Sequence, residues 1–293
     1  MKRRIGLLLI VSCVFAVQAY QLYANEPSPN ELVAAHLKSI GEQNLLPHIK
    51  SISFIGGVET EFILGMSGHL TGITMLMSEG EKFGLTMRFQ DLNYPAEHFA
   101  FDGNRVTVGT IMPGLRSPLA DFLFRYDKVM GNGMLGGVFS TSWPLLDIAG
   151  NQPTMQRVRT VKVDGADLYE LEYRPRDFHG DMRIRLYFEP ETYRHVRTEY
   201  RVRTENDVTT GFNSEFMPIT QLSTRGESFY TLTEKFGDFR KIGGLTMPYS
   251  YTLDYMIDGY AQSGFIASWK MTVGEIGFNS PNIEQGFFTA EKQ

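Results

Sequence analysis

The chain has a single cysteine, Cys13, among its 293 residues, and this cysteine lies in the first apolar stretch. The rest of the chain can form no internal disulfide and has no Cys-x-x-Cys pair for a metal or for redox chemistry. The His-Glu-x-x-His pattern and the phosphate-binding P-loop are missing as well, and the six histidines show no metal-ligand spacing. We therefore expect no enzyme, no cofactor and no metal site.

One glycine-rich stretch, GNGMLG from Gly131 to Gly136, matches the G-x-G-x-x-G pattern of dinucleotide sites. That pattern needs a strand before it and a helix that opens on it. Here a helical pattern precedes the glycines, and VFSTSWP follows them. The stretch predicts a turn, and a nucleotide is not an expected ligand.

The first 24 residues have the parts of a secretory signal peptide. Basic residues 2–4 precede an apolar run at 5–19, and cleavage after Ala19 or Ala24 fits the pattern. The run is shorter than the roughly 20 residues that span a bilayer. We predict a signal peptide at 1–24 and a mature periplasmic chain at 25–293. Lipid anchoring at Cys13 is the competing hypothesis, but apolar sequence continues beyond this residue.

An excess of positive charge is also lacking, since 28 Lys and Arg stand against 33 Asp and Glu, a net charge of −5. Loss of the signal peptide removes three basic residues and no acidic one, which lowers the net charge to −8. Nucleic-acid binding needs a basic field on the protein surface. Nucleic acid is therefore not an expected partner.

One amphipathic helix is predicted directly after the signal peptide. Ser28 and Glu31 form a capping box, Pro29 suits the first helical position, and Gly41 is a natural stop. His36 lies beside the apolar stripe, so we expect it at the boundary between the helix and solvent.

Beyond this helix the pattern changes to a period of two. Residues 82–90 and 264–273 alternate apolar and polar side chains, which is typical of antiparallel strands with one buried face. No strand–helix–strand alternation is present, so a parallel sheet is not expected. The chain is predicted to be mainly β, a large curved antiparallel sheet or incomplete β-barrel with a few short covering helices. Similar runs occur near 49–56, 58–65, 70–78, 97–101, 104–110, 155–163, 167–174, 181–188, 193–203, 227–236 and 248–257.

Residues 115–150 interrupt the strands with a helical insertion. Ser117 and Pro118 predict a helix start, and Ser142 before Trp143 predicts a second short helix that closes at Gly150. Residues 204–226 are polar and predict a long hairpin loop. The range 25–293 is otherwise expected to form a single domain.

The sequence MRIRLYFEPETYRHVRTEYRVR, 182–203, predicts an arginine-rich hairpin around the turn Glu189–Thr192. By the period of two, His195 and Glu199 share the wet face with the arginines, and Glu199 can pair with them across the strands. A solvated outer face is one interpretation, and a docking surface for an acidic partner or a lipid headgroup is the other. The predicted surface residues are Arg183, Arg185, Arg197, Arg201 and Arg203.

The apolar face of the N-terminal strands offers a candidate ligand site. Methionine is flexible and polarizable, so methionine-rich faces adapt to ligands of variable shape, although such residues also form ordinary cores. We hypothesise that the insertion covers a cavity on this face. The predicted lining residues are Met75, Met77, Leu85, Met87, Phe99 and Phe101, with Leu119, Phe122 and Trp143 as the cover.

Three stretches carry a resemblance to a known family: VDGADLYELEYRP at 163–175, IRLYFEPETYRHVRTEY at 184–200 and FGDFRKIGGLTMPYSYTL at 236–253. Together with the helical insertion after the sixth predicted strand, they are similar to the periplasmic lipoprotein carriers of LolA/LolB-like fold. The resemblance implies an incomplete β-barrel whose helices form a lid over an apolar cavity, and carriers of this family shield lipoprotein acyl chains. This chain is longer than those carriers.

Two functions are therefore considered. The first is a periplasmic carrier or binding protein for an acyl chain, a lipoprotein or another apolar ligand. The second is a non-catalytic envelope interaction or assembly module with a filled core, for which an envelope protein is the partner. A closed core under helix 117–126 favours the second, and an open tunnel lined by methionines favours the first.

Overall fold

The computed structural model describes residues 26–42, 45–176, 178, 180–205, 227–259, 264–281 and 284–290. The predicted signal peptide, Cys13 and all but the start of the 204–226 loop lie outside these residues. The strands are β1 Ser51–Leu64, β2 Gly68–Glu79, β3 Lys82–Phe89, β4 Ala96–Phe101, β5 Val106–Val108, β6 Thr154–Met155, β7 Arg159–Val163, β8 Ala166–Arg174, β9 Arg183–Phe188, β10 His195–Glu205, β11 Glu227–Ile242, β12 Leu245–Asp258 and β13 Phe265–Phe278. The helices are α2 Pro29–Ile40, α3 Pro118–Arg125, α4 Lys128–Gly131 and α5 Ile148–Asn151, with 3-10 turns η1 Leu46–His48, η2 Gly137–Phe139, η3 Pro144–Asp147 and η5 Gln285–Phe288.

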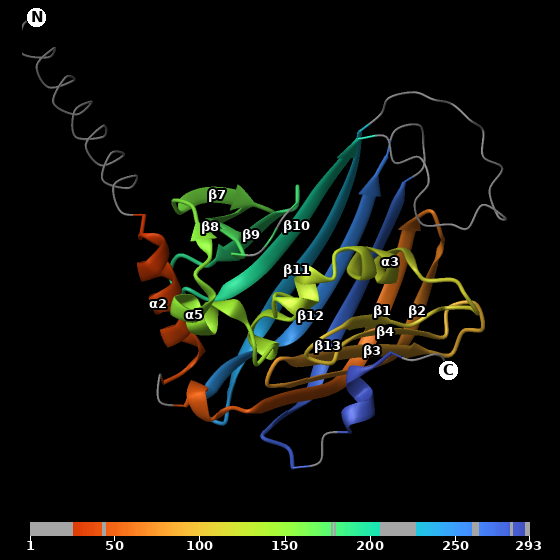
Figure 1. Cartoon of the computed structure of the whole chain (residues 1–293), viewed down its shortest axis with the longest axis horizontal. Helices are drawn as coiled ribbons and strands as arrows, with labels where there is room; N and C mark the ends of the chain where they lie inside the picture. Colours follow the sequence, from red (N-terminus) through yellow and green to blue (C-terminus); the bar gives the residue numbers. More distant parts are fainter. Residues whose placement is uncertain are drawn as a thin grey trace, which may run out of the picture.

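The strands form one twisted antiparallel sheet (Figure 1). Its order is β5-β4-β3-β2-β1-β13-β12-β11-β10-β9-β8-β6, and β7 pairs with β8. Within the described part of the chain the hydrogen-bonded series ends at β5 and at β6, so the sheet does not close. This confirms the predicted class, a large open antiparallel sheet with a few short helices.

The first strand is longer than the sequence pattern predicted, because the runs at 49–56 and 58–65 are one strand. Gly56 and Gly57 in its middle blur the alternation, and β1 has a register shift against β13 at Gly56. A Cβ at Gly56 would lie 2.1 Å from the carbonyl oxygen of Thr272, so only glycine fits there. The helical insertion consequently follows the fifth strand and not the sixth. The predicted strand at 155–163 is in turn divided into β6 and β7.

The helices begin where the capping residues predict. Ser28 and Glu31 form the expected capping box of α2, and the Ser117 hydroxyl accepts a 3.0 Å hydrogen bond from the N–H of Ala120 at the start of α3. Among the described residues, no helix is long and apolar enough to cross a membrane.

Residues 115–150, here called the covering segment, cross one face of the sheet (Figure 1, yellow and green). We call that face the inner face and the opposite one the outer face. The described backbone–backbone hydrogen bonds of the covering segment have their partners within residues 111–152. The covering segment is thus joined to the sheet through its side chains and a few polar contacts, and not by strand pairing.

Candidate functional site

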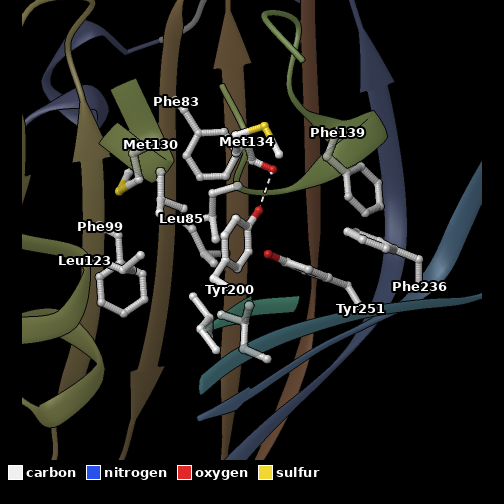
Figure 2. Packing of buried hydrophobic residues seen from close by; sticks show 14 of the residues in the cluster. Phe83, Leu85, Phe99, Leu123, Met130, Met134, Phe139, Tyr200, Phe236 and Tyr251 are labelled. Carbon is white, nitrogen blue, oxygen red and sulfur yellow. Dashed lines mark hydrogen bonds between the residues drawn. The ribbon is translucent and has the colours of Figure 1, made fainter. Parts of the chain in front are cut away.

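Seven of the nine predicted ligand-site residues belong to the core that the sheet and the covering segment form together. Leu85 pairs with Phe99 across β3 and β4, and Figure 2 labels both, with Leu123 of α3, in the same packed cluster. All seven are buried, with less than a tenth of each side chain exposed. They are Leu85, Met87, Phe99, Phe101, Leu119, Phe122 and Trp143.

Met75 and Met77 are on the outer face, so their predicted position was wrong. Leu76 pairs with Leu85 on the inner face, where it is fully buried, while Met75 and Met77 are partly exposed. The run around them is apolar on both faces, and the period of two therefore could not choose between the faces. The polar neighbour Ser78 is buried on the inner face and bonds to Thr141 of the covering segment (2.7 Å).

The inner face is filled with side chains in this structure. Phe139 of the covering segment packs against Phe54 of β1, with ring centroids 4.9 Å apart, and against Tyr251 of β12 at 6.0 Å. A hollow of about 10 Å³ lies between α3 and residues Tyr230 and Tyr255, enough for about one water molecule. The described residues therefore form a closed core and no open tunnel.

A buried carboxyl group joins the middle of the covering segment to the sheet. Oε1 of Glu234, on β11, accepts hydrogen bonds from the N–H of Gly136 (2.7 Å) and the hydroxyl of Tyr251 (2.6 Å). Its Oε2 lies 2.7 Å from the hydroxyl of Tyr200, which is also 3.0 Å from the carbonyl oxygen of Met134. Figure 2 draws this last bond. We call Glu234, Tyr200 and Tyr251 the acid–tyrosine cluster.

The hydrogen bonds of this cluster are all satisfied when Glu234 is protonated. Tyr200 has a single hydroxyl hydrogen but lies near two acceptors, Met134 O and Glu234 Oε2. A proton on Oε2 is donated to Tyr200, whose own hydrogen then bonds to Met134. Burial raises the pKa of Glu234 to about 7, although the hydrogen bonds that it accepts oppose this.

Glu97, on β4, makes a second contact of this kind. Glu97 is 1% exposed, and its carboxyl group accepts a hydrogen bond from the hydroxyl of Tyr94. The hydroxyl of Ser117, the N-cap of α3, is a second polar group that helps to stabilise the carboxylate. Burial is the main reason that the pKa of Glu97 is raised to about 7. This carboxyl group thus holds the first turn of α3 to the sheet.

A third contact lies at Trp143, which packs between two buried histidines. The Trp143 ring is 5.0 Å from His36 of α2 and 5.0 Å from His195 of β10. Burial lowers the pKa of His36 to about 4. Burial, together with the nearby His36, lowers the pKa of His195 well below its ordinary range. Both rings are therefore neutral near pH 7.

Neither histidine lies where the sequence placed it. His36 was expected at a boundary with solvent, but Trp143 and Phe188 pack on that side of α2. His195 was expected on the wet face with the arginines. A register shift between His195 and Arg197 breaks the period of two and turns His195 to the inner face.

Glu234 and Glu97 escaped the sequence analysis, although each had a visible signal. Glu234 lies in the alternating series Tyr230, Leu232, Glu234, Phe236, and Glu97 precedes Phe99 and Phe101 in the same way. An acid in phase with apolar residues of a strand must be buried with them. That rule would have found both carboxyl groups.

The arginine surface lies on the outer face, but it is not uniformly exposed as expected. Arg183, Arg201 and Arg203 are exposed. Arg185 and Arg197 are not, with side chains 24% and 18% exposed, because both pair with Glu199 (3.2 and 3.7 Å). The acidic partners neutralise much of the positive charge that a docking surface for an acidic partner would need.

We expect this difference in exposure to appear in stability. Arg203→Ala should change the free energy of unfolding by less than about 1 kcal/mol, because Arg203 and its partner Glu227 are both about half exposed. Arg185→Ala should cost about 1–3 kcal/mol, because Glu170 and Glu199, 9% and 16% exposed, each lose a charged partner. Urea titration of the two variants measures this, and equal effects would contradict it.

Within the described residues, no group of three or more His, Cys, Asp or Glu could hold a metal ion. The acids with a raised pKa are buried beneath the covering segment, so this state gives a substrate no access to them. What the geometry offers is an apolar face, a covering segment and polar contacts between the two.

Neither the family models nor the curated proteins include a match to this chain. The solved structures do include similar chains. A protein domain from Vibrio parahaemolyticus assigned to outer membrane lipoprotein sorting has 9% identity and a TM-score of 0.39, covering 88% of this chain and 95% of that one. A LolA superfamily protein from Nitrosomonas europaea has 12% identity and a TM-score of 0.41, covering 90% and 98%. MucB in complex with MucA(peri) has 11% identity and a TM-score of 0.22, covering 86% and 98%. The first two are of the family that the sequence resembles.

Proposed function

We propose that this protein is a non-catalytic binding protein of the periplasm that holds an acyl chain or a similar apolar ligand on the inner face of its sheet. The observation that carries the proposal is the way the covering segment is attached. It brings a layer of apolar side chains onto the inner face, yet its described backbone–backbone hydrogen bonds run within residues 111–152, and its described polar bonds to the sheet all involve sheet side chains or side chains of its own. It can move away without breaking any strand pairing.

The closed core is the form that such a protein takes without a ligand. An empty apolar cavity is costly, at roughly 24 cal/mol per Å³ in a measured series on another protein. The covering segment avoids this cost because Phe139, Met134 and Trp143 occupy the inner face themselves. The expected contrast between a closed core and an open tunnel therefore does not separate the two functions.

The alternative is an envelope interaction or assembly module with a permanently filled core. The closed packing is compatible with it, and the arginine surface would be its docking face. Because Arg185 and Arg197 are already paired with Glu199, this surface offers less free charge than the sequence suggested. The binding function is the one that also accounts for the covering segment.

A reversible lock on the covering segment tests the proposal. The hydroxyl oxygens of Ser78 on β2 and Thr141 of the covering segment are 2.7 Å apart, and disulfides need neighbouring side chains of this kind. Residues 25–293 contain no cysteine, so S78C/T141C has only this pair to oxidise. We expect a pyrene-labelled acyl chain to bind the reduced variant at least about tenfold tighter than the oxidised one.

The single variants S78C and T141C control for the loss of each hydroxyl, and they should bind equally well with and without reductant. Trp143 fluorescence gives a second readout, assigned by comparison with Trp269→Phe. If the unlocked protein binds no acyl probe at all, the filled interaction module is the better account.

A further inference from the structure

We infer that the acid–tyrosine cluster is a recognition site for an amide-bearing acyl ligand, and that residues 134–136 of the covering segment occupy this site when no ligand is present. The inference rests on the proposed binding function and adds the chemical class of the ligand. It comes from the polar groups in the inner face, which an apolar ligand alone would not need.

The cluster binds the backbone of the covering segment as it would bind a ligand. Tyr200 donates a hydrogen bond to the carbonyl oxygen of Met134, and Glu234 accepts one from the N–H of Gly136, two residues later. No side chain of either residue takes part in these bonds. A left-handed Gly136 (φ +87°), whose absent Cβ would lie 2.7 Å from the Phe83 ring, allows the close approach.

The same pattern of groups exists in an N-acyl amino-acid amide. Its acyl carbonyl corresponds to Met134 O, and its second amide N–H corresponds to the N–H of Gly136. The alkyl chain would then extend along the inner-face side chains that the displaced covering segment no longer covers, among them Leu85 and Phe99. A displaced covering segment takes away the bonds to the Gly136 N–H and the Met134 carbonyl, and an apolar ligand over the cluster would replace neither of them, which is unfavourable.

A free fatty acid or an ester fits this site less well. An ionised carboxylate would face Glu234, and an ester replaces the N–H by an oxygen that repels Glu234 Oε1. A buried site that hydrogen-bonds a ligand N–H discriminates against an analogue without it. The cluster therefore favours the amide over both.

The test uses two probes that differ in one atom, N-dodecanoylglycine methylamide and N-dodecanoylglycine methyl ester. Isothermal titration at pH 7 should show the amide binding the wild-type protein about tenfold tighter than the ester. In Glu234→Leu this preference should fall to about one, while the alkyl chain still binds. Tyr255→Phe is the matched control, because Tyr255 contacts Phe122 of the covering segment (5.2 Å) and not the cluster, and it should keep the preference.

Tyr200→Phe tests the other half of the site in case Glu234→Leu does not fold. It removes the donor to the acyl carbonyl, so both probes should weaken by a similar factor of about ten. Equal binding of the amide and the ester by the wild-type protein would overturn the inference and leave the proposed function standing. Binding of neither probe would refute both.

Discussion

Trp269→Ala is expected to lower the free energy of unfolding by about 3–5 kcal/mol, the range for removing a large aromatic side chain from a packed core. Trp269 is fully buried on β13, where it pairs with Leu253 of β12 and with Thr60 of β1. Its ring packs edge-on against Phe62, with centroids 6.2 Å apart. The cavity would therefore open in the middle of the sheet, where the surrounding strands cannot collapse into it.

Trp143→Ala provides the comparison, since Trp143 is buried to a similar degree but belongs to the covering segment. Under the proposed function the covering segment opens while the sheet stays folded, so we expect a smaller loss of global stability. Urea unfolding followed by far-ultraviolet circular dichroism measures both variants. A loss below about 1 kcal/mol for Trp269→Ala would show that the inner face of the sheet is not close-packed.

The sequence predicts those parts of the fold that local chemistry determines. The starts of α2 and α3 follow from Ser28 and Ser117, whose hydroxyl groups cap the first turn. The strands with clear alternation, such as β3 and β13, follow from the period of two. The order of strands in the sheet and the bulge at His195 depend on pairing between distant segments, which a local pattern does not contain.

The candidate site was predictable in part for the same reason. Leu85 and Met87 alternate with polar residues, and Phe99 and Phe101 lie two residues apart on the next strand, so a common face was evident. The face of Met75 and Met77 could not be chosen from the pattern, because Leu76 between them is equally apolar. The acid–tyrosine cluster joins β10, β11, β12 and the covering segment, and only the folded chain brings these four segments together.

Glu234→Gln is expected to make the closed protein more stable than the wild type at pH 8, by up to about 3 kcal/mol, and to change its stability little at pH 4. Glutamine resembles the protonated acid. Its Oε1 can accept from Gly136 and Tyr251, and its Nε2 can donate to Tyr200, which then donates to Met134. The amide keeps these bonds at every pH, whereas the acid keeps them only while protonated.

The direction follows from the pKa of Glu234, which burial raises from 4.5 to about 7. Between these values the closed protein holds a proton that the unfolded chain has lost, so the stability contributed by Glu234 falls as the pH rises from about 4.5 to 7. Above pH 7 the loss is complete, and it amounts to about 1.36 kcal/mol for each unit by which the pKa in the closed protein exceeds that in the unfolded chain. Glutamine does not titrate and avoids this loss.

The comparison with the wild type is needed because other buried groups titrate in the same range. Glu97 has a similarly raised pKa, while the lowered pKa of His36 makes stability rise between about pH 4 and 6.5, and the lowered pKa of His195 acts in the same direction. These slopes have opposite signs in the wild type. Subtracting the free energy of unfolding of the wild type from that of Glu234→Gln at each pH cancels the contributions of these other groups and leaves the contribution of Glu234.

Glu234→Leu separates ionisation from hydrogen bonding. It cannot ionise, but it leaves the Gly136 N–H and the Tyr251 hydroxyl without an acceptor, so it should be less stable than Glu234→Gln at every pH. Urea unfolding at pH 4, 6 and 8 resolves the three proteins. If Glu234→Gln proves less stable than the wild type at pH 8, the closed core favours the carboxylate over the protonated acid, and the pKa of Glu234 is not raised. In that case Tyr200 donates its hydrogen to Glu234, and the carbonyl of Met134 loses its hydrogen bond to Tyr200.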